Sequence, residues 1–180
     1  MIRRPYPPGQ KRKRKTSSLS EFGKELKEKQ KLKNLYHLKE RQFKNYVKKI
    51  LEKRGKVEDA SDLLIKVLES RLDNVVFRLG FANSKIKARQ LVSHGYFLVN
   101  GKPVNVPSFR LKKGDIVSVK TSKAKKPVFK DVKNIIKKNK PLTWLEINTD
   151  KLEGKIIGEP SLAETAPPVE IASIFEFYSR

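Results

Sequence analysis

The sequence contains no cysteine and only two histidines, His37 and His94, which lie far apart in the chain. Without cysteine, the protein has no disulfide bond, no thiolate nucleophile and no cysteine-based zinc site. Two separate histidines are too few for a histidine-ligated metal site or a histidine-based catalytic triad. We therefore predict that the protein uses no metal ion or other cofactor, has no small-molecule substrate and is not an enzyme.

Long apolar segments are missing as well. No run of apolar residues approaches the roughly 18 that a helix needs to cross a bilayer. The segment after Met1 also has no apolar core of the kind that a signal peptide requires. We therefore expect no membrane partner and a location in the cytoplasm or another compartment rich in nucleic acid. A length of 180 residues allows one domain or two small ones, which leaves little room for a catalytic domain beside a binding domain.

What the chain has in excess is positive charge. It carries 42 Lys and Arg against 19 Asp and Glu, a formal net charge of +23. Such a charge predicts a polyanionic partner, above all a nucleic acid, although charge alone does not separate RNA from DNA. The net charge is +15 over residues 1–56, +12 over residues 57–140 and −4 over residues 141–180. The first two-thirds should therefore bind the polyanion, and the acidic end should pack against the chain's own body or a basic neighbour.

Residues 1–18 have the composition of a basic N-terminal arm. The segment MIRRPYPPGQKRKRKT holds seven Lys and Arg, three Pro and no acid, so it has too few apolar side chains to form a core. We expect this arm to lie along RNA phosphates. Its candidate contacts are Arg3, Arg4, Lys13 and Arg14. The alternative is a disordered, solubilising tail.

Residues 19–69 are predicted to form a helical domain that C-terminal elements complete. Ser17, Ser18 or Ser20 can cap its first helix, and Ser18 with Glu21 fits a capping box. Apolar residues then follow a helical spacing whose phase changes near residues 36 and 37, which predicts a bend between two helices. The two apolar sets are Phe22, Leu26, Leu32, Leu35 and Tyr36, and then Leu38, Phe43, Tyr46, Val47, Ile50 and Leu51. Gly55 should end the second helix, and residues 57–62 should form a polar connection.

Two further helices are predicted next. Apolar residues at helical spacing run from Leu64 to Leu79, and Gly80 suits the end of that helix. Ser84 can cap a second helix from Lys85 to about Ser93, which Gly95 would end. Ala88, Leu91 and Val92 would face the core from this second helix.

Residues 70–120 as a whole are predicted to be an RNA-binding module. Asn100-Gly101 stands between two strand-like segments and is a strong hairpin signal, because this pair accepts the positive φ angles of a type I′ turn. A half-buried strand over residues 116–120 follows. The predicted fold class is therefore α+β, with an N-terminal helical part and an RNA-binding domain in which an αα-hairpin packs on a small, mostly antiparallel sheet.

Residues 121–180 are predicted to hold a basic linker, a short helix and C-terminal strands. The helix should span residues 127–138. Strand-like segments follow at residues 143–147, 155–157 and 174–178, and we expect all three to join the same sheet. Trp144, the single tryptophan, should anchor that sheet.

The candidate binding surface lies on the helix that starts at Lys85. Lys85, Arg89 and Ser93 fall at i, i+4 and i+8 and so share one edge. Lys87, Gln90 and His94 flank this edge and add hydrogen-bond donors suited to phosphate and 2′-hydroxyl oxygens. Arg71 and Asp73 could be proposed as a catalytic pair, but a local ion pair or an RNA contact by Arg71 is the simpler interpretation. His94 suits a helix-end donor better than a general base, and Tyr96 could stack on a base.

The segment SRLDNVVFRLGFANSKIKARQLVSHGYFLVNGKPVNVPS resembles the RNA-binding domain of small-subunit ribosomal protein S4. That domain also occurs in some RNA-modifying enzymes and tyrosyl-tRNA synthetases, so by itself it leaves several functions open. The segments RRPYPPGQ, LSEFGKELKEKQKLKNLY, ERQFKNY, PLTWLEIN and FEFYSR resemble the same ribosomal protein in the same order. The likeness to this family therefore covers nearly the whole chain.

The resemblance implies a primary binder of small-subunit ribosomal RNA that joins early in assembly and clasps a multi-helix junction in the 5′ domain. It also implies a place near the messenger RNA entry channel, a contact with ribosomal protein S5 and other small-subunit proteins, and an influence on decoding accuracy. By resemblance the RNA contacts fall on Arg3, Arg4, Arg71, Lys85, Arg89, Gln90, Ser93, His94, Asn100 and Lys102. The charge pattern adds Lys13, Arg14 and Lys87 to this set.

Two other functions stay open for a chain with this module. One is an RNA-modifying enzyme such as a pseudouridine synthase, and the other is a stress-related binder of stalled large subunits. Many members of the ribosomal family begin with a further segment that often carries a metal-binding cysteine cluster. This sequence starts just before RRPYPPGQ and has no cysteine, so the resemblance implies a short form without that cluster. The expected location is the cytoplasmic ribosome, with an organellar ribosome as the alternative.

Overall fold

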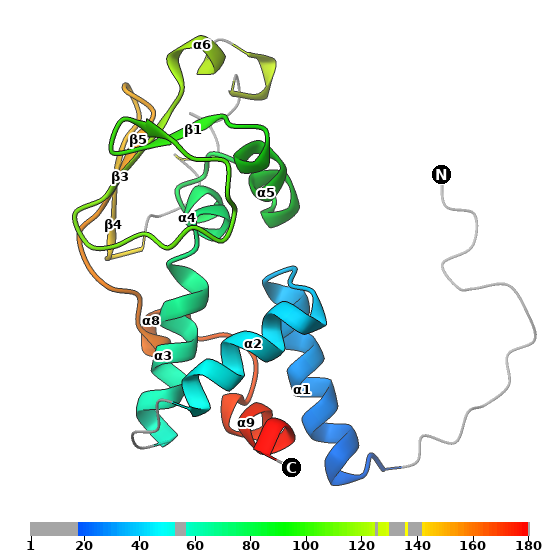
Figure 1. Cartoon of the computed structure of the whole chain (residues 1–180). Coiled ribbons are helices and arrows are strands. Elements are labelled where there is room, and N and C mark those ends of the chain that lie inside the picture. Colours follow the sequence, from blue (N-terminus) through cyan, green and yellow to red (C-terminus); the bar gives the residue numbers. More distant parts are fainter. Residues whose placement is uncertain (1–17, 53–56, 125, 130–135, 137–141, 180) are drawn as a thin grey trace, which may run out of the picture.

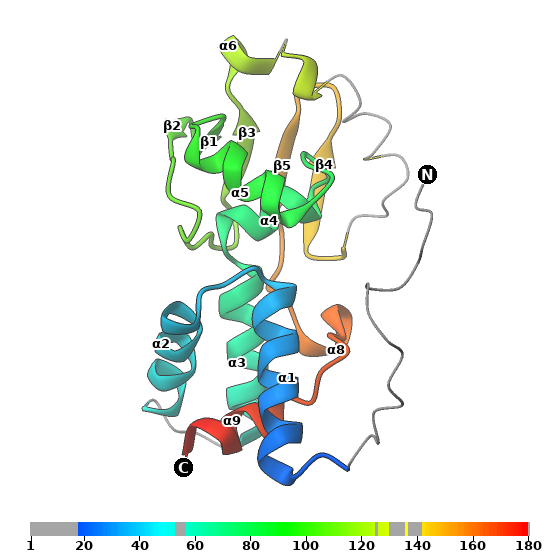
Figure 2. The same ribbon diagram turned by 90° about the vertical axis from the view of Figure 1, so that its right-hand side faces the viewer.

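The computed structural model describes residues 18–52, 57–124, 126–129, 136 and 142–179. These residues form two lobes, a helical lobe and a mixed lobe, which meet end to end (Figure 1; Figure 2). In the mixed lobe two helices pack on a five-stranded sheet in which each neighbouring pair of strands is antiparallel. The α+β fold class predicted from the sequence is therefore confirmed.

The helical lobe is built from both ends of the described chain. It contains α1 (Glu21–Leu35), α2 (Glu40–Leu51), α3 (Val57–Glu69), α8 (Leu162–Thr165) and α9 (Ile171–Ser179). The bend predicted near residues 36 and 37 is present, because His37 has a φ of +48° between α1 and α2. The buried apolar side chains of this lobe are Leu32, Tyr36, Leu38, Phe43, Val47, Ile50, Leu64, Ile65, Leu68, Ile171, Ile174 and Phe175.

Helix α1 buries a different face from the one its apolar residues predict. Its buried side chains are Glu25, Lys29 and Leu32, whereas Phe22 is 51% exposed. The charged face can be buried because Lys29 donates a hydrogen bond to Glu40 of α2 at 2.8 Å. Of the three serines predicted as possible caps, Ser20 caps α1, with its side chain accepting from the Gly23 N–H at 3.3 Å, so the cap lies two residues after that of the predicted Ser18 capping box.

Helix α9 corrects the third predicted C-terminal strand, residues 174–178. Ile and aromatic side chains in this region favour a strand on composition, yet Ile171, Ile174 and Phe175 recur at helical spacing and are all buried in the helical lobe. The helix packs along α1 and α2, with the rings of Phe22 and Phe177 5.3 Å apart. Tertiary packing therefore overrides local propensity here.

The helix predicted to run from residue 64 to residue 79 is broken in two. Helix α3 ends at Glu69 and α4 spans Leu72–Arg78, because Arg71 is extended, with φ −69° and ψ 140°. A crossing segment satisfies the first N–H groups of α4: the Leu72 N–H donates to the Phe109 carbonyl at 2.9 Å, and the Asp73 N–H donates to the Pro107 carbonyl at 3.1 Å. Helix α3 also begins at Val57, so the polar connection predicted for residues 57–62 is wrong.

The mixed lobe contains α4, α5 (Lys85–Ser93) and the sheet. The strands are β1 (Phe97–Val99), β2 (Lys102–Pro103), β3 (Ile116–Val119), β4 (Leu145–Asn148) and β5 (Glu153–Ile156), in the order β2-β1-β3-β5-β4. Helix α5 begins where it was predicted to begin, with the Ser84 hydroxyl accepting from the Lys87 N–H at 3.2 Å. The hairpin at Asn100 and Gly101 is also confirmed, with φ +49° and +76°.

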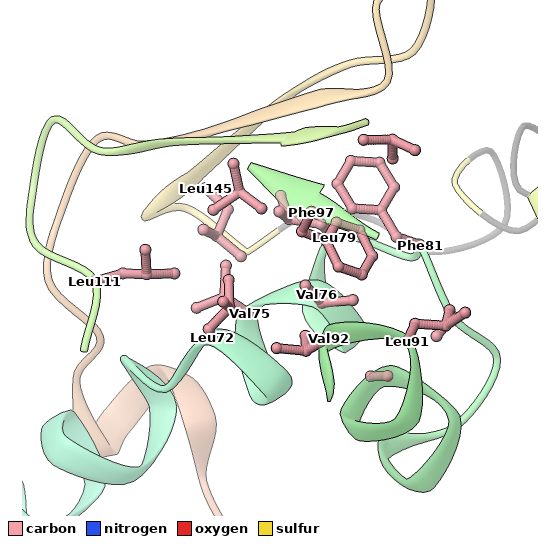
Figure 3. Close-up of a cluster of buried hydrophobic side chains, with 14 of the residues drawn as sticks. Leu72, Val75, Val76, Leu79, Phe81, Leu91, Val92, Phe97, Leu111 and Leu145 are labelled. Atoms are coloured by element: carbon pink, nitrogen blue, oxygen red, sulfur yellow. The ribbon is translucent and has the colours of Figure 1, made fainter. Parts of the chain in front are cut away.

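One layer of apolar side chains joins the two helices to the sheet. Figure 3 shows Val75 and Val76 of α4, Leu79 at the C-terminal end of α4 and Val92 of α5 between these helices and the sheet. The contact between α4 and β5 is especially close, because a Cβ at Gly154 would lie 2.4 Å from both terminal carbons of Leu79. Glycine at position 154 therefore lets α4 lie directly on the sheet.

The segment between β3 and β4 is described only in part. It includes α6 (Thr121–Ala124), within the predicted basic linker, and the 3-10 helix η1 (Pro127–Phe129). Most of the helix predicted for residues 127–138 lies outside the described residues. Trp144 is 3% exposed and packs in the core of the mixed lobe, as predicted.

Candidate nucleic-acid interface

Helix α5 displays one polar edge to solvent. Ala88, Leu91 and Val92 are buried against the core, so the opposite side of the helix is accessible. Gln90, Ser93 and His94 are exposed, and Lys87 and Arg89 are partly buried. We define this set of five residues, Lys87, Arg89, Gln90, Ser93 and His94, as the α5 edge. It combines positive charge with neutral hydrogen-bond donors, a combination that suits phosphate and ribose oxygens.

Two lysines from the segment that follows β3 extend the α5 edge beyond its C-terminal end. Lys123 donates from Nζ to the His94 carbonyl at 2.6 Å, and this places a cation at the negative end of the helix dipole. Lys123 and Lys126 also lie over the Tyr96 ring, with Nζ 4.3 Å and 5.3 Å from its centroid. The sequence pattern did not identify these two lysines as part of the surface. They lie there because β3 pairs with β1, which brings residue 120 next to Tyr96.

Tyr96 was a candidate for stacking on a base, and its surroundings are now defined. Besides the two lysines, the ring of Phe129 lies 5.9 Å from the Tyr96 ring. The ring is therefore occupied by protein side chains and serves mainly to hold the adjacent cations in place.

Lys85, the first residue of α5, points toward the helical lobe. Its Nζ lies 4.0 Å from the ring centroid of Tyr36 at the end of α1. Burial lowers the pKa of Lys85 to about 8, and the nearby Glu69 carboxylate opposes this shift. Lys85 was predicted to share the exposed edge with Arg89 and Ser93, but it bridges the two lobes instead.

Arg71, which was predicted to contact RNA directly, is buried in the protein alone. The side chain is 1% exposed and forms a forked pair with Asp73, in which Nε donates to Oδ1 at 3.0 Å and Nη2 donates to Oδ2 at 2.6 Å. Its third donor, Nη1, reaches the Tyr46 hydroxyl at 2.7 Å. The local ion pair is therefore the correct interpretation of Arg71 and Asp73.

Arg89 lies next to this buried pair but keeps access to solvent. Its Nη1 is 3.6 Å from Asp73 Oδ2, and 34% of the side chain is exposed. Asp73 therefore attracts the buried Nη1 of Arg89, while about a third of the Arg89 side chain remains accessible. This arrangement suits a residue that contacts a phosphate in a fixed orientation.

The hairpin candidates Asn100 and Lys102 differ in their availability. Asn100 Nδ2 donates to Asp115 at 2.8 Å and its Oδ1 accepts from the Ile116 N–H at 2.9 Å. Both ends of this amide are thus engaged in holding the hairpin against β3, whereas Lys102 is exposed. The remaining candidates, Arg3, Arg4, Lys13 and Arg14, lie outside the described residues.

The helical lobe adds a second group of cations next to α5. The contact between Lys85 and Tyr36 places the start of α5 beside the α1–α2 corner (Figure 1). The exposed basic residues of α2 are Arg41, Lys44, Lys48 and Lys49. Of these, Lys48 is the one that forms an ion pair with another described residue, at 3.8 Å from Glu52. The two lobes can therefore present positive charge to one extended polyanion.

Two kinds of site are absent from the described part of the chain. No group of three or more His, Asp or Glu side chains there could hold a metal ion. None of the helices described is long and apolar enough to cross a membrane. The geometry on the α5 edge can hold and orient a ligand by charge and hydrogen bonds.

Two family models match the chain in succession. Residues 1–69 match a model described as "Ribosomal protein S4/S9 N-terminal domain". Residues 70–117 match a model described as "S4 domain". The boundary between the two matches falls at the break between α3 and α4.

Similar proteins span nearly the whole sequence. A protein of Thermotoga maritima named small ribosomal subunit protein uS4 is 45% identical over 179 residues, which cover 99% of this chain and 84% of that protein. Proteins of the same name from Thermodesulfovibrio yellowstonii and Kosmotoga olearia are 42% and 44% identical, and the matches cover 99% and 100% of this chain and 84% and 85% of those proteins.

Proposed function

The chain belongs to the ribosomal protein S4 family, and on this basis we propose that it is a structural constituent of the small ribosomal subunit. It binds small-subunit ribosomal RNA and catalyses no reaction. The observation that carries this proposal is the α5 edge, an accessible row of cations and donors on the domain that matches the S4 domain. Phosphate contacts would supply most of the affinity, and the shape of the RNA would supply the selectivity.

The finer role that we propose is that of a primary binder of a multi-helix junction in the 5′ domain of this RNA. The protein would join early in assembly and lie near the messenger RNA entry site beside ribosomal protein S5, where it influences decoding accuracy. The two-lobed shape supports a junction as the ligand, because cations on α2 and on α5 can reach different RNA helices at once. Since the similar proteins named above are bacterial, we propose the cytoplasmic ribosome as its location.

Sedimentation of a native extract tests the assignment to the small subunit. The extract is separated on a sucrose gradient, and the chain is followed by mass spectrometry together with known proteins of each subunit. We expect the chain to sediment with small subunits and with assembled ribosomes. Sedimentation with large subunits alone would favour the stress-related binder, and turnover on ribosomal RNA by the free protein would favour an RNA-modifying enzyme.

A titration across salt tests the binding surface itself. Purified protein is titrated with a junction fragment of small-subunit ribosomal RNA, and we expect log K to fall by about 0.7 to 0.9 per phosphate contact for each unit of log salt concentration. Lys87→Ala on α5 should weaken binding and reduce this slope by about one contact. Lys155→Ala is the matched control, because Lys155 is exposed on β5 between Gly154 and Ile156, which face the helices. An equal slope for wild type and Lys87→Ala would remove this residue from the interface.

A further inference from the structure

A carboxylate is fully buried where the two lobes meet. Glu69, the last residue of α3, is 0% exposed. Its Oε1 accepts hydrogen bonds from the Tyr36 hydroxyl at 2.6 Å and from Arg78 Nη2 at 2.8 Å. Its Oε2 accepts from Asn74 Nδ2 at 2.6 Å and from Arg78 Nε at 3.0 Å. Both oxygens are therefore saturated by charged or neutral donors, which is what a buried carboxylate requires.

The donors to this carboxylate come from both lobes. Tyr36 ends α1 in the helical lobe, whereas Asn74 and Arg78 lie on α4 in the mixed lobe. Lys85 of α5 closes the arrangement, because its Nζ lies over the ring of the same Tyr36 at 4.0 Å. We define Tyr36, Glu69, Asn74, Arg78 and Lys85 as the Glu69 hub. Its members link α1, α3, α4 and α5 at one point.

Directional bonds of this kind fix orientation in a way that apolar contact does not. The forked pair between Arg78 and Glu69 and the short bond from Tyr36 are satisfied at one relative angle of the lobes. Burial opposes ionisation of Glu69, but the Arg78 guanidinium and the Tyr36 hydroxyl outweigh it and lower the pKa of Glu69. The carboxylate therefore stays charged, and any rotation of one lobe would leave a buried charge without its partners.

The apolar cores do not fix this angle on their own. The buried apolar side chains fall into two clusters, one in each lobe, and no residue belongs to both. Where α3 meets α4, Ser70 forms a turn and Arg71 is extended, so only two residues connect the two helices. Polar contacts therefore carry much of the orientation between the cations of α2 and the α5 edge.

We propose that the Glu69 hub sets the selectivity of the protein for one RNA shape by holding the two cationic surfaces at a fixed angle. Tyr36, Glu69 and Arg78 are then positioning residues, which determine specificity without touching the RNA. This inference rests on the proposed function, since it concerns how the same RNA is selected. A variant with a weakened Glu69 hub should discriminate less well between RNA shapes. Its charge-driven affinity should change less, because the number of cations is unchanged.

The first experiment measures the angle directly. Because the chain has no cysteine, Asn45→Cys on α2 and Glu146→Cys on β4 give a unique pair of labelling sites at exposed positions. The distance distribution between spin labels is measured by double electron–electron resonance in the full chain. We expect one narrow distribution in the wild type and a broader one after Glu69→Gln, which keeps the shape of the side chain but removes its charge.

The second experiment measures selectivity as a ratio of two affinities at one salt concentration. The two probes are a junction fragment of small-subunit ribosomal RNA and a continuous RNA duplex of the same length. We expect Glu69→Gln and Tyr36→Phe to reduce this ratio, with about a tenfold loss for Glu69→Gln, while the salt slope on the duplex stays the same. A merely structural role would lower stability and leave the ratio unchanged.

Tyr178→Phe is the matched control. It also removes a tyrosine hydroxyl from a carboxylate, since Tyr178 Oη donates to Glu40 at 2.8 Å, but both residues lie in the helical lobe. We expect this variant to leave the ratio within about twofold of the wild type. If Glu69→Gln fails to fold, Arg78→Lys replaces it, because lysine keeps the charge but cannot form the fork.

The outcomes separate the two proposals. A wild-type protein that binds junction and duplex equally well overturns the proposed role as a binder of an RNA junction. A wild type that discriminates, together with hub variants that discriminate equally well and give equally narrow distance distributions, overturns the role of the Glu69 hub. A disulfide introduced across the lobes that restores the ratio in Glu69→Gln would support the hub independently of its charge.

Discussion

At the scale of single residues, this basic protein contains both buried and exposed ion pairs. Arg71 and Asp73 show the first case, with side chains only 1% and 8% exposed. Lys48 and Glu52 show the second, since this pair is 71% and 61% exposed. Buried pairs of this kind fix geometry, whereas exposed pairs contribute little to stability.

Asp73→Ala should destabilise the protein strongly. The substitution leaves the Arg71 guanidinium buried with the Tyr46 hydroxyl as its remaining partner, and an uncompensated buried charge costs about 3 to 5 kcal/mol. Urea unfolding followed by circular dichroism measures the loss. Glu52→Ala is the control, and we expect it to change the free energy of unfolding by less than about 0.5 kcal/mol. A loss of similar size in both variants would contradict the structural role of Asp73.

Glu40 should contribute to the acid sensitivity of the helical lobe. Partial burial raises its pKa, but hydrogen bonds from Lys29, Tyr178 and Lys33 outweigh this and lower the pKa from 4.5 to about 2. A depressed carboxylate pKa contributes stability that is present above pH 4.5 and is lost as the pH falls toward 2. We therefore expect Glu40→Gln to be less stable than wild type at pH 7, with a smaller difference at pH 3.

Thermal unfolding at the two pH values, with exposed Glu146→Gln as the control, measures this dependence. A difference between Glu40→Gln and wild type that stays constant from pH 7 to pH 3 would exclude Glu40 as its source.

At the scale of elements, the sequence correctly predicted the α5 cap and the hairpin turn, which depend mainly on neighbouring residues. Helix α5 begins at the residue after Ser84 and gives way to a glycine at position 95, and the Asn100-Gly101 turn forms the hairpin, because caps and turns depend on the residues within them. The break between α3 and α4 depends instead on a segment more than thirty positions later, whose carbonyls at 107 and 109 accept from α4. No local pattern near residue 70 records that contact.

The same distinction explains the errors at the candidate site and the C-terminus. Helical spacing placed Lys85 on an exposed edge, but only the position of Tyr36 shows that the space above Lys85 is filled. The residues of α9 have strand-like composition, and their helix is stabilised by contacts with α1 and α2. The charge and the spacing on α5 were enough to predict the surface, whereas the orientation of each cation depended on the tertiary structure.

Gly154→Ala should disturb the contact between α4 and the sheet. The new methyl group would lie 2.4 Å from two carbons of Leu79, a fully buried side chain, so one of the two must shift. Overpacking of this kind costs about 1 to 3 kcal/mol. Gly23→Ala in α1 is the matched control, because its nearest neighbours are 3.4 Å away and alanine favours a helix.

Chemical denaturation compares the two glycine variants. We expect Gly154→Ala to be less stable than wild type and Gly23→Ala to be equally or more stable. A Gly154→Ala variant as stable as wild type would show that the contact between Leu79 and β5 has room for a methyl group.

At the scale of the whole molecule, the acidic C-terminal segment closes the basic helical lobe. Glu159 pairs with Lys66 of α3, Tyr178 donates to Glu40, and Lys29 lies 4.4 Å from the ring centroid of Phe177. The segment thus packs against the chain's own body, as its charge predicted. Among the described residues, α2, the α5 edge and the segment that follows β3 carry cations that the proposed function assigns to RNA.

Deleting residues 170–180 should unfold the helical lobe and spare the mixed lobe. The deletion removes Ile171, Ile174 and Phe175, which are each at most 6% exposed, and truncating one such side chain alone costs about 2 to 5 kcal/mol. Hydrogen exchange read by mass spectrometry should show loss of protection in α1 and α2 and retained protection in β1 and β3. Loss of protection in both lobes would mean that they unfold as one unit.

The contact between the ring of Phe22 in α1 and the ring of Phe177 in α9 has a consequence for the order in which the two lobes fold during synthesis. The chain leaves the ribosome from its N-terminus, so α1 and α2 are exposed long before α9 exists to cover them. The mixed lobe, whose strands end with β5, can close earlier than the helical lobe that precedes it in the sequence. The helical lobe is therefore completed after the mixed lobe, once α9 has been synthesised.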